Sequence, residues 1–310
     1  MRSFAITLMN YRCFSGNGPT TWRFTGEGLT SFVGPNNAGK STFLRLFFEL
    51  RTVFATLAEE TNLRAYVLNP NFGLAFAGTS DNTAEIVAYR STGPVVIEFS
   101  IDVADPHQLS RVRLQLQDRK AQAWAAQIFS GPDFSQVNVQ DGEYPPVVAG
   151  INGRLETAEF SACMKTLSEG VTYIPAYRNL INQGSGTYYD VLVGQGFVQM
   201  WDQWQGGDSK DNREAIIDVI ADIKRVFGFS ELGVAATPQK DTLTLVVDGR
   251  PERIRELGAG LSQFIIVLGN VATKRPEILV IDEPELNLHP AMQLKFLAAL
   301  GPTFCSCRCS

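Results

Sequence analysis

The strongest constraint on this chain is a glycine-rich loop between a β-prone run and a stretch with helical spacing. Residues 34–41 read GPNNAGKS, which fits the pattern G-x-x-x-x-G-K-[ST]. Residues 29–33 before the loop favour a strand, and residues 41–50 after it place apolar side chains at helical spacing. In this order the loop presents backbone N–H groups at the N-terminus of a helix, where phosphate oxygens bind. The sequence therefore predicts a strand, a phosphate-binding loop and a helix.

The residues of this loop have separate predicted roles. Gly34 and Gly39 are expected to permit positive φ and a close approach of the backbone to phosphate. We assign Lys40 to the β- and γ-phosphates, with a part in catalysis, and the Ser41 hydroxyl to Mg²⁺. The remaining predicted contacts to the nucleotide are Asn36, Asn37, Ala38 and Thr42. The alternative is a chance glycine turn before a helix.

A second motif lies near the other end of the chain. Residues 278–281 are aliphatic and β-branched, as expected of a strand buried on both faces, and Asp282 and Glu283 follow them. We assign Asp282 to Mg²⁺ through its water shell, and Glu283 to the catalytic base that polarises the attacking water. The alternative is a surface Asp-Glu pair at the end of an edge strand. Together the two motifs predict ATP and Mg²⁺ as ligands.

A third element, residues 256–263, reads ELGAGLSQ and runs into the apolar stretch 264–268. Two glycines at the start of a helix form an anion-binding N-terminus. A single domain rarely needs two such sites for one nucleotide. We therefore expect Gly258, Gly260 and Ser262 to cap the γ-phosphate held by a second copy of the protein. A glycine-rich turn before a core helix is the alternative.

The composition is that of a folded protein. Of 310 residues, 45% are hydrophobic and 19% are charged, which is too apolar for disorder. No apolar run approaches the length of about 18 residues that is needed to cross a bilayer, and no signal peptide is evident. We therefore expect a cytoplasmic protein without membrane contact. The net charge of −5 argues against a globally basic nucleic-acid binder, although a local basic groove remains compatible with it.

The middle of the chain shows weaker patterns. Residues 95–103 alternate like a strand, and we interpret residues 107–129 as helix with a basic face. That face either contacts DNA phosphate or is a solvated surface. Further on, a capped helix closes at Gly228, and a hairpin joins residues 233–236 to 242–247. No heptad pattern is sustained, which excludes a long coiled coil.

Taken together, these motifs resemble the ABC-type ATPase heads of the SMC, RecF and OLD (overcoming lysogenization defect) group, often described as AAA-family ATPases. Other matching stretches are residues 10–14 (NYRCF), 173–178 (YIPAYR) and 281–293 (IDEPELNLHPAMQ). The resemblance implies an α/β P-loop NTPase: a mostly parallel, ABC-head-like sheet flanked by helices, with an antiparallel β lobe and a helical insertion.

The resemblance also implies a division of the chain. Residues 1–104 would form the N-terminal half of the ATPase head, and residues 231–304 its C-terminal half with the signature-like element. A largely helical region, residues 105–230, would be inserted between them. Residues 305–310 carry alternating cysteines and are interpreted as an aberrant or flexible tail rather than a metal site.

In this family two heads sandwich two ATP molecules, so the resemblance implies a homodimer. His289 would lie in the region that communicates across the dimer, or simply start a helix. Tyr11 or Phe14 would stack near adenine or belong to the core. Family members usually carry a later switch histidine, but no histidine follows His289, which implies a chain that ends before a core strand. Ala176 stands where a γ-phosphate-sensing glutamine is common.

The expected function is an ATP-binding and ATP-hydrolysing switch that dimerises around ATP and serves a DNA-directed activity, in repair or phage defence. A separate nuclease or effector chain, and DNA, are candidate partners. Two alternatives stay open: the ATPase part of an OLD-type nuclease without its Toprim domain, and an ATP-binding scaffold that does not hydrolyse. A nucleotide-binding subunit of a membrane transporter is disfavoured because the LSGGQ motif is absent.

Overall fold

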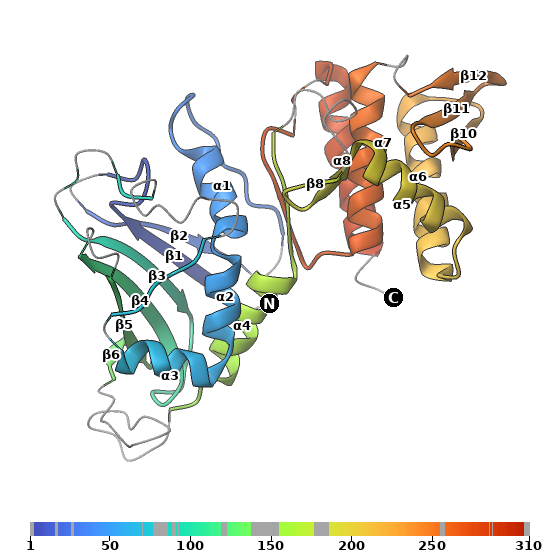
Figure 1. Ribbon diagram of the computed structural model, residues 1–310. Coiled ribbons are helices and arrows are strands. Elements are labelled where there is room, and N and C mark those ends of the chain that lie inside the picture. The colour runs from blue at the N-terminus through green and yellow to red at the C-terminus, as the bar shows by residue number, and fades with distance from the viewer. Residues whose placement is uncertain are drawn as a thin grey trace. The chain divides into compact units, whose positions relative to one another are not determined.

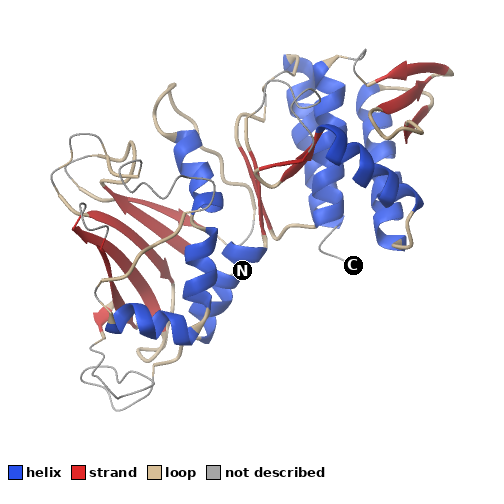
Figure 2. Cartoon of the chain, viewed as in Figure 1, coloured by secondary structure: helices blue, strands red, loops and turns tan. Residues whose placement is uncertain are grey.

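The computed structural model describes residues 3–15, 18–25, 28–69, 71–76, 86–88, 91, 93–118, 123–137, 155–176, 186–254, 258–284, 286 and 288–306. The chain divides into two compact units, Met1–Gly170 and Val171–Ser310 (Figure 1). Each unit contains both helices and sheets, so the protein is a mixed α/β protein (Figure 2). The boundary between the units falls inside the predicted insertion 105–230, whose described residues are therefore shared between them.

The first unit is built on a six-stranded antiparallel sheet with the order β2-β1-β3-β4-β5-β6. Its strands are β1 (Phe4–Met9), β2 (Thr20–Phe24), β3 (Val95–Ile101), β4 (Leu109–Asp118), β5 (Ala123–Ser130) and β6 (Ser135–Gln136). The helices of this unit are α1 (Lys40–Glu49), α2 (Arg51–Ala58), α3 (Glu60–Leu68) and α4 (Ala158–Glu169).

Two predictions for this unit are wrong. Within the predicted helix 107–129, the described residues form instead the antiparallel pair β4 and β5. The reason is a period of two, because the buried Val112 and Leu114 alternate with the half-exposed Arg111 and Arg113. The largest sheet is also antiparallel rather than mostly parallel. Short connections between β3, β4 and β5 permit only antiparallel pairing, since a parallel pair needs a long crossover.

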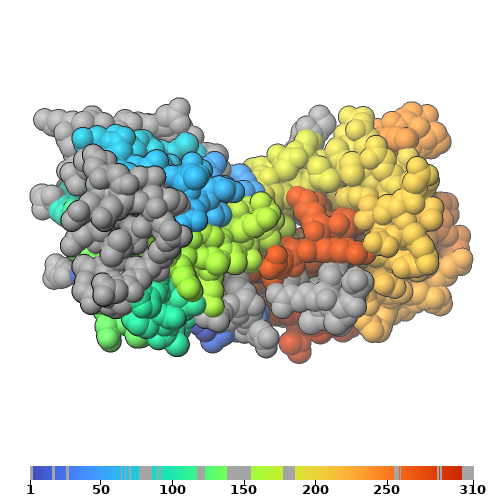
Figure 3. Space-filling model, turned by 90° about the horizontal axis from the view of Figure 1, so that it is seen from below, coloured from blue at the N-terminus to red at the C-terminus, as the bar shows by residue number. Residues whose placement is uncertain are grey.

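One face of this sheet forms the core of the first unit. Most residues of β1 and β3 are buried, among them Ile6, Leu8, Ile97 and Phe99. The ring of Phe54 on α2 lies 5.1 Å from the ring of Phe99, so this helix packs on the buried face. Helix α2 also packs against α4, and the outer sides of both helices are visible in Figure 3.

The described residues of the second unit form three small sheets. An antiparallel sheet consists of β10 (Leu232–Ala236), β11 (Leu243–Val247) and β12 (Arg250–Arg253). A parallel pair joins β7 (Val171–Ile174) to β13 (Ile278–Ile281), and an antiparallel pair joins β8 (Gly186–Tyr188) to β9 (Val191–Val193). The helices are α5 (Gly194–Gly206), α6 (Lys210–Phe227), α7 (Ala259–Lys274) and α8 (Pro290–Ser306).

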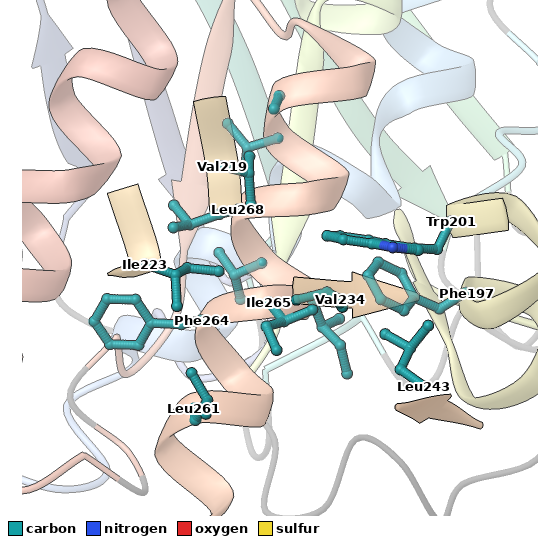
Figure 4. Close-up of a cluster of buried hydrophobic side chains, with 14 of the residues drawn as sticks. Phe197, Trp201, Val219, Ile223, Val234, Leu243, Leu261, Phe264, Ile265 and Leu268 are labelled. Carbon is teal, nitrogen blue, oxygen red and sulfur yellow. The ribbon is translucent and has the colours of Figure 1, made fainter. Parts of the chain in front are cut away.

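Helix α7 forms the centre of the second unit. Its side chains Phe264, Ile265 and Leu268 are buried in one hydrophobic cluster, which also includes Phe197 and Trp201 of α5 (Figure 4). The apolar stretch 264–268 is therefore helical, as predicted. A helix that is apolar around most of its circumference must be covered on several sides, and α5, α6 and α8 provide that cover.

The local signals in this unit are confirmed. Helix α6 begins after Ser209, whose Oγ accepts a hydrogen bond from the Asn212 N–H at 3.3 Å, and ends at Gly228 with φ 75°. The predicted hairpin is present as β10 and β11, with β12 added to it. Helix α8 continues to Ser306 and so includes the first two residues of the predicted tail 305–310. The remaining tail residues lie outside the described residues.

No helix in the described part of the chain combines the length and hydropathy that crossing a membrane requires.

Candidate nucleotide-binding site

The predicted phosphate loop leads directly into helix α1 of the first unit. The loop turns at Asn36 and Asn37, and α1 begins at Lys40. Gly39 adopts φ 88° and ψ 9°, so a left-handed residue immediately precedes a right-handed helix. Such an alternation turns successive N–H groups to one side, which is the geometry of an anion-binding nest.

The start of α1 is suited to an anion. It has no side-chain cap, and no acidic residue lies in its first turn. The first N–H groups of a helix have no acceptor within it, and they carry the positive end of the helix dipole. The local chemistry of residues 34–41 therefore favours a phosphate ligand.

Position 39 favours glycine because there is little room for a side chain, as well as because of its backbone conformation. A Cβ atom added at this position would lie 2.7 Å from Cys13 Sγ and 3.2 Å from the ring of Phe14. Gly34 differs, since its φ is not positive and an added Cβ would make only an ordinary contact of 3.8 Å with Ala38. Gly39 therefore uses the positive φ that glycine permits, whereas Gly34 does not.

Lys40 folds back over the loop. Its Nζ donates hydrogen bonds to the carbonyl oxygens of Gly34 at 2.7 Å and Pro35 at 2.8 Å. These bonds hold the ammonium group over the backbone turn, where it adds a positive charge to the N–H groups of the loop. Ser41 is exposed in the first turn of α1, and Thr42 beside it is half-buried.

Residues 29–33 do not form the predicted strand. Leu29 is 89% exposed and Val33 is 93% exposed, which is unusual for two apolar residues of β-prone sequence. A strand needs a neighbour for its backbone N–H and C=O groups, and in the described part of the chain this run pairs with none. The loop therefore follows an extended, unpaired segment.

Of the two aromatic candidates for adenine, Tyr11 belongs to the core. Its ring is fully buried, and its hydroxyl donates to Glu49 Oε2 at 2.7 Å. Phe14 is half-buried, and its ring lies 5.0 Å from that of Trp22 and 6.5 Å from that of Phe43. Phe14 therefore packs between Gly39 and the Trp22 ring and is not free to stack on a base.

The carboxylate pair lies in the second unit, at the end of strand β13. This strand pairs in parallel with β7, and the Asp282 N–H extends the pairing by donating to the Ile174 carbonyl at 2.9 Å. Asp282 is buried, whereas Glu283 is exposed. Of the four residues of β13 only Val280 is buried, so the strand is less covered than predicted.

Glu283 has a strained backbone. Its φ is 48°, in the left-handed region that non-glycine residues rarely adopt. Such conformations cost about 1–3 kcal/mol and cluster at functional sites. The turn at Glu283 is closed by a hydrogen bond from the Leu286 N–H to the Glu283 carbonyl at 3.0 Å. The left-handed residue Glu283 thus begins a turn directly after Asp282.

The signature-like element opens helix α7. Gly258 is the N-cap residue, and the first turn has neither a side-chain cap nor an acidic residue. Ser262 is not directed outward, because its buried hydroxyl donates to the Ile254 carbonyl at 3.3 Å. Gly258 is exposed and Gly260 half-buried, so they are the accessible part of this element. Residues 256 and 257 lie outside the described residues.

His289 starts helix α8. Its Nδ1 accepts a hydrogen bond from the Ala291 N–H at 3.3 Å, and its carbonyl accepts one from the Met292 N–H at 2.7 Å. The sequence allowed two roles for His289, the start of a helix or a contact across a dimer. The structure shows the first of these roles. Ala176, in the predicted sensor position, lies just beyond β7 and is half-buried.

The predicted site residues divide between the two units. All of the phosphate-loop residues belong to the first unit, while Asp282, Glu283 and the signature-like residues belong to the second. Sequence reasoning missed Glu49, a carboxylate buried at the end of α1, and Asp190, whose carboxylate accepts from the Tyr173 N–H at 2.8 Å. The only signal for Glu49 was that it is the one acidic residue of α1.

Within the described ranges, no three His, Cys, Asp or Glu side chains gather as a metal-binding group. Of the two predicted Mg²⁺ ligands, Ser41 belongs to the first unit and Asp282 to the second. A scan against protein-family models found no match, and a search of curated protein sequences also found none.

Proposed function

We propose that this protein binds ATP through the loop at residues 34–41 and uses it as a conformational switch. The observation that carries the proposal is the start of α1. There a left-handed Gly39, an uncapped helix N-terminus and the folded-back Lys40 all favour a phosphate group. In phosphoryl transfer a protein mainly positions groups and stabilises charge, and these three features supply both.

Mg²⁺ and hydrolysis are the second part of the proposal. Ser41 and Asp282 would hold Mg²⁺, which neutralises charge on the phosphates. Glu283 would act as the general base, because an exposed carboxylate next to a metal ligand can polarise an attacking water molecule. The strained backbone at Glu283 supports this role, since strain of this kind is seldom retained without a functional reason.

The finer fold assignment, an ABC-type ATPase head, is also a proposal. The parallel pairing of β7 with β13 supports it, because Asp282 and Glu283 then follow the carboxyl end of a parallel strand, where α/β proteins place their ligands. The antiparallel lobe β10–β12 is consistent with it. The largest sheet does not support it, being antiparallel throughout.

We further propose that two copies dimerise around ATP, with Gly258 and Gly260 at the start of α7 facing the γ-phosphate bound by the other copy. The switch would then serve a DNA-directed activity, in repair or phage defence, through DNA itself or a separate effector chain. The open alternatives are an OLD-type ATPase without its Toprim domain and a scaffold that binds ATP without hydrolysing it.

Calorimetry of ATP binding with Mg²⁺, together with steady-state hydrolysis, tests this function. The variants are Lys40→Ala and Glu283→Gln, with Lys295→Ala on α8 as a charge-matched control. We expect Lys40→Ala to weaken ATP binding and Glu283→Gln to abolish turnover with binding retained. Binding without turnover in the wild type would favour the scaffold alternative. Absence of ATP binding in the wild type would refute the proposal.

A further inference from the structure

A tight turn formed by residues 10–14 touches both ends of helix α1. At the start of the helix, Cys13 and Phe14 lie against Gly39, with Cys13 Sγ 2.7 Å from the position of an added Cβ. At the end of the helix, the Glu49 carboxylate accepts hydrogen bonds from Tyr11 Oη and Arg12 Nη2, both at 2.7 Å. One segment therefore connects the phosphate loop to a carboxylate at the far end of α1.

Glu49 is a buried charge with several partners. Its side chain is 1% exposed, and Arg45 Nε donates to it at 2.5 Å in addition to the bonds from Tyr11 and Arg12. A buried carboxylate is costly unless charged and hydrogen-bonded partners surround it. Burial, and next the charge of Glu49, raise the pKa of Tyr11, so the phenol keeps its proton and remains a donor. Removing this charge would therefore leave buried donors without their acceptor.

The turn itself is held in an unfavourable conformation. Asn10 has φ 56° and Arg12 has φ 49°, and neither is a glycine. Asn10 Nδ2 donates to the Pro94 carbonyl at 2.8 Å, and the Arg12 N–H donates to the Ile86 carbonyl at 2.7 Å. Two left-handed residues persist only where the surroundings fix them. Glu49 is one of the groups that fix this turn.

We propose that Tyr11, Arg12 and Glu49 are positioning residues for the phosphate loop. Their hydrogen bonds fix the conformation of the turn 10–14. That turn then holds Gly39 and the first residues of α1 in the phosphate-binding conformation. This inference rests on the proposed ATP site for its purpose, although its structural claim can be tested without nucleotide.

The chain offers a matched control in the same unit. Glu98 on β3 is also buried, and it accepts from Arg113 Nε at 2.7 Å and pairs with Arg111 Nε at 3.2 Å. It therefore shares the chemistry of Glu49, a buried carboxylate between arginines, but its partners lie on β4 and not on the turn 10–14. Glu98→Gln should perturb the sheet and leave the loop unchanged.

The first arm of the test is amide hydrogen exchange without nucleotide. The reporter is the Phe43 N–H, which donates to the Gly39 carbonyl at 2.9 Å at the opposite end of α1 from Glu49. In Glu49→Gln we expect exchange at Phe43 to be roughly tenfold to a hundredfold faster, the effect of losing charge-assisted hydrogen bonds. Tyr11→Phe should produce a smaller increase in the same amide, and Glu98→Gln none.

A purely local role for Glu49 gives a different result. Exchange would then quicken only in the last turn of α1, around residues 46–50, with Phe43 as slow as in the wild type. That outcome, or an equal increase at Phe43 in Glu98→Gln, would overturn the proposal. Should Glu49→Gln fail to fold, Tyr11→Phe decides the question through the same amide.

The second arm compares ATP with adenosine by calorimetry. Glu49→Gln should weaken ATP binding about tenfold relative to any change in adenosine binding, because only the phosphates contact the loop. Unchanged ATP affinity in that variant would count against the proposal. A wild type that binds no ATP refutes the proposed function alone, since the exchange arm still decides whether the turn positions the loop.

Discussion

Replacement of Gly39 by alanine tests the geometry of the phosphate loop most directly. Gly39 combines φ 88° with close neighbours, so two independent penalties apply to the same methyl group. An alanine in the left-handed region costs about 1–2 kcal/mol relative to glycine. The overlap with Cys13 Sγ at 2.7 Å and with the Phe14 ring at 3.2 Å forces these side chains to move, which typically costs about 1–3 kcal/mol.

The expected loss for Gly39→Ala is therefore about 2–5 kcal/mol. For a unit the size of Met1–Gly170, this corresponds to a fall of about 4–20 °C in the midpoint of thermal unfolding. Differential scanning calorimetry measures the shift. Combining Gly39→Ala with Cys13→Ala removes the closest contact and should recover about 1 kcal/mol or more of the loss, while the conformational penalty remains.

Gly34→Ala is the matched control for this experiment. It adds the same methyl group to the same loop, but at a residue without positive φ whose closest contact would be 3.8 Å from Ala38. We expect its free energy of unfolding to stay within about 1 kcal/mol of the wild type. Equal unfolding temperatures for Gly39→Ala, Gly34→Ala and the wild type would refute the close packing of Gly39 on the turn 10–14.

Three further predictions concern other parts of the molecule. A hydrogen bond from the Ser230 hydroxyl lowers the pKa of Asp248. The ionised carboxylate therefore stabilises the fold at pH values above its unfolded pKa of about 3.9. This stabilisation is lost as the pH falls through the lower pKa of the folded state. The stability difference between wild type and Asp248→Asn, measured by urea unfolding, should therefore shrink in strongly acidic buffer. Asn270→Leu should cost about 2–5 kcal/mol in the same assay, because the buried Asn270 amide satisfies both the N–H and the carbonyl of Leu192, at 2.9 and 3.2 Å. Burial raises the pKa of Cys163 to about 12, so iodoacetamide at pH 8 should label this thiol only after denaturation, and rapid labelling of the native protein would contradict its burial.

Elements with local signals were predictable from the sequence. Helix α6 has a serine cap at its start, an amphipathic pattern along its length and Gly228 at its end, and each signal acts within a few residues. The loop before α1 was equally readable, because the positive φ of Gly39 is a property that glycine alone adopts at little cost. Local chemistry decided these elements, and the structure agrees with them.

Elements that depend on distant partners were not predictable in the same way. In residues 107–129 the charged side chains suggested a helical face, but the pairing of β4 with β3 and β5 sets a period of two. Residues 29–33 have strand propensity without a partner strand in the described structure, and propensity alone does not form a ladder. In the first case neighbouring strands supply the decisive hydrogen bonds, and in the second no described strand supplies them.

The candidate site shows the same division. Lys40, Asp282 and Glu283 became candidates through motifs, since phosphate and metal chemistry restricts the residue types in such motifs. Glu49 was not recognisable, because its proposed role comes from Tyr11 and Arg12, which meet it only when the turn 10–14 lies against the end of α1. Supporting residues of this kind carry no motif of their own.

The energetics of the phosphate loop follow from this tertiary support. Asn10 and Arg12 are each held in left-handed backbone conformations, at about 1–3 kcal/mol apiece, so the local sequence does not favour the turn beneath the loop. The hydrogen bonds of Glu49, those from Asn10 and Arg12 to backbone carbonyls, and the packing of Phe14 against neighbouring rings offset that cost. Gly39 and Glu49 therefore both contact the turn 10–14, from opposite ends of α1. Their substitutions should be non-additive, and Gly39→Ala combined with Glu49→Gln should destabilise the protein by less than the sum of the two.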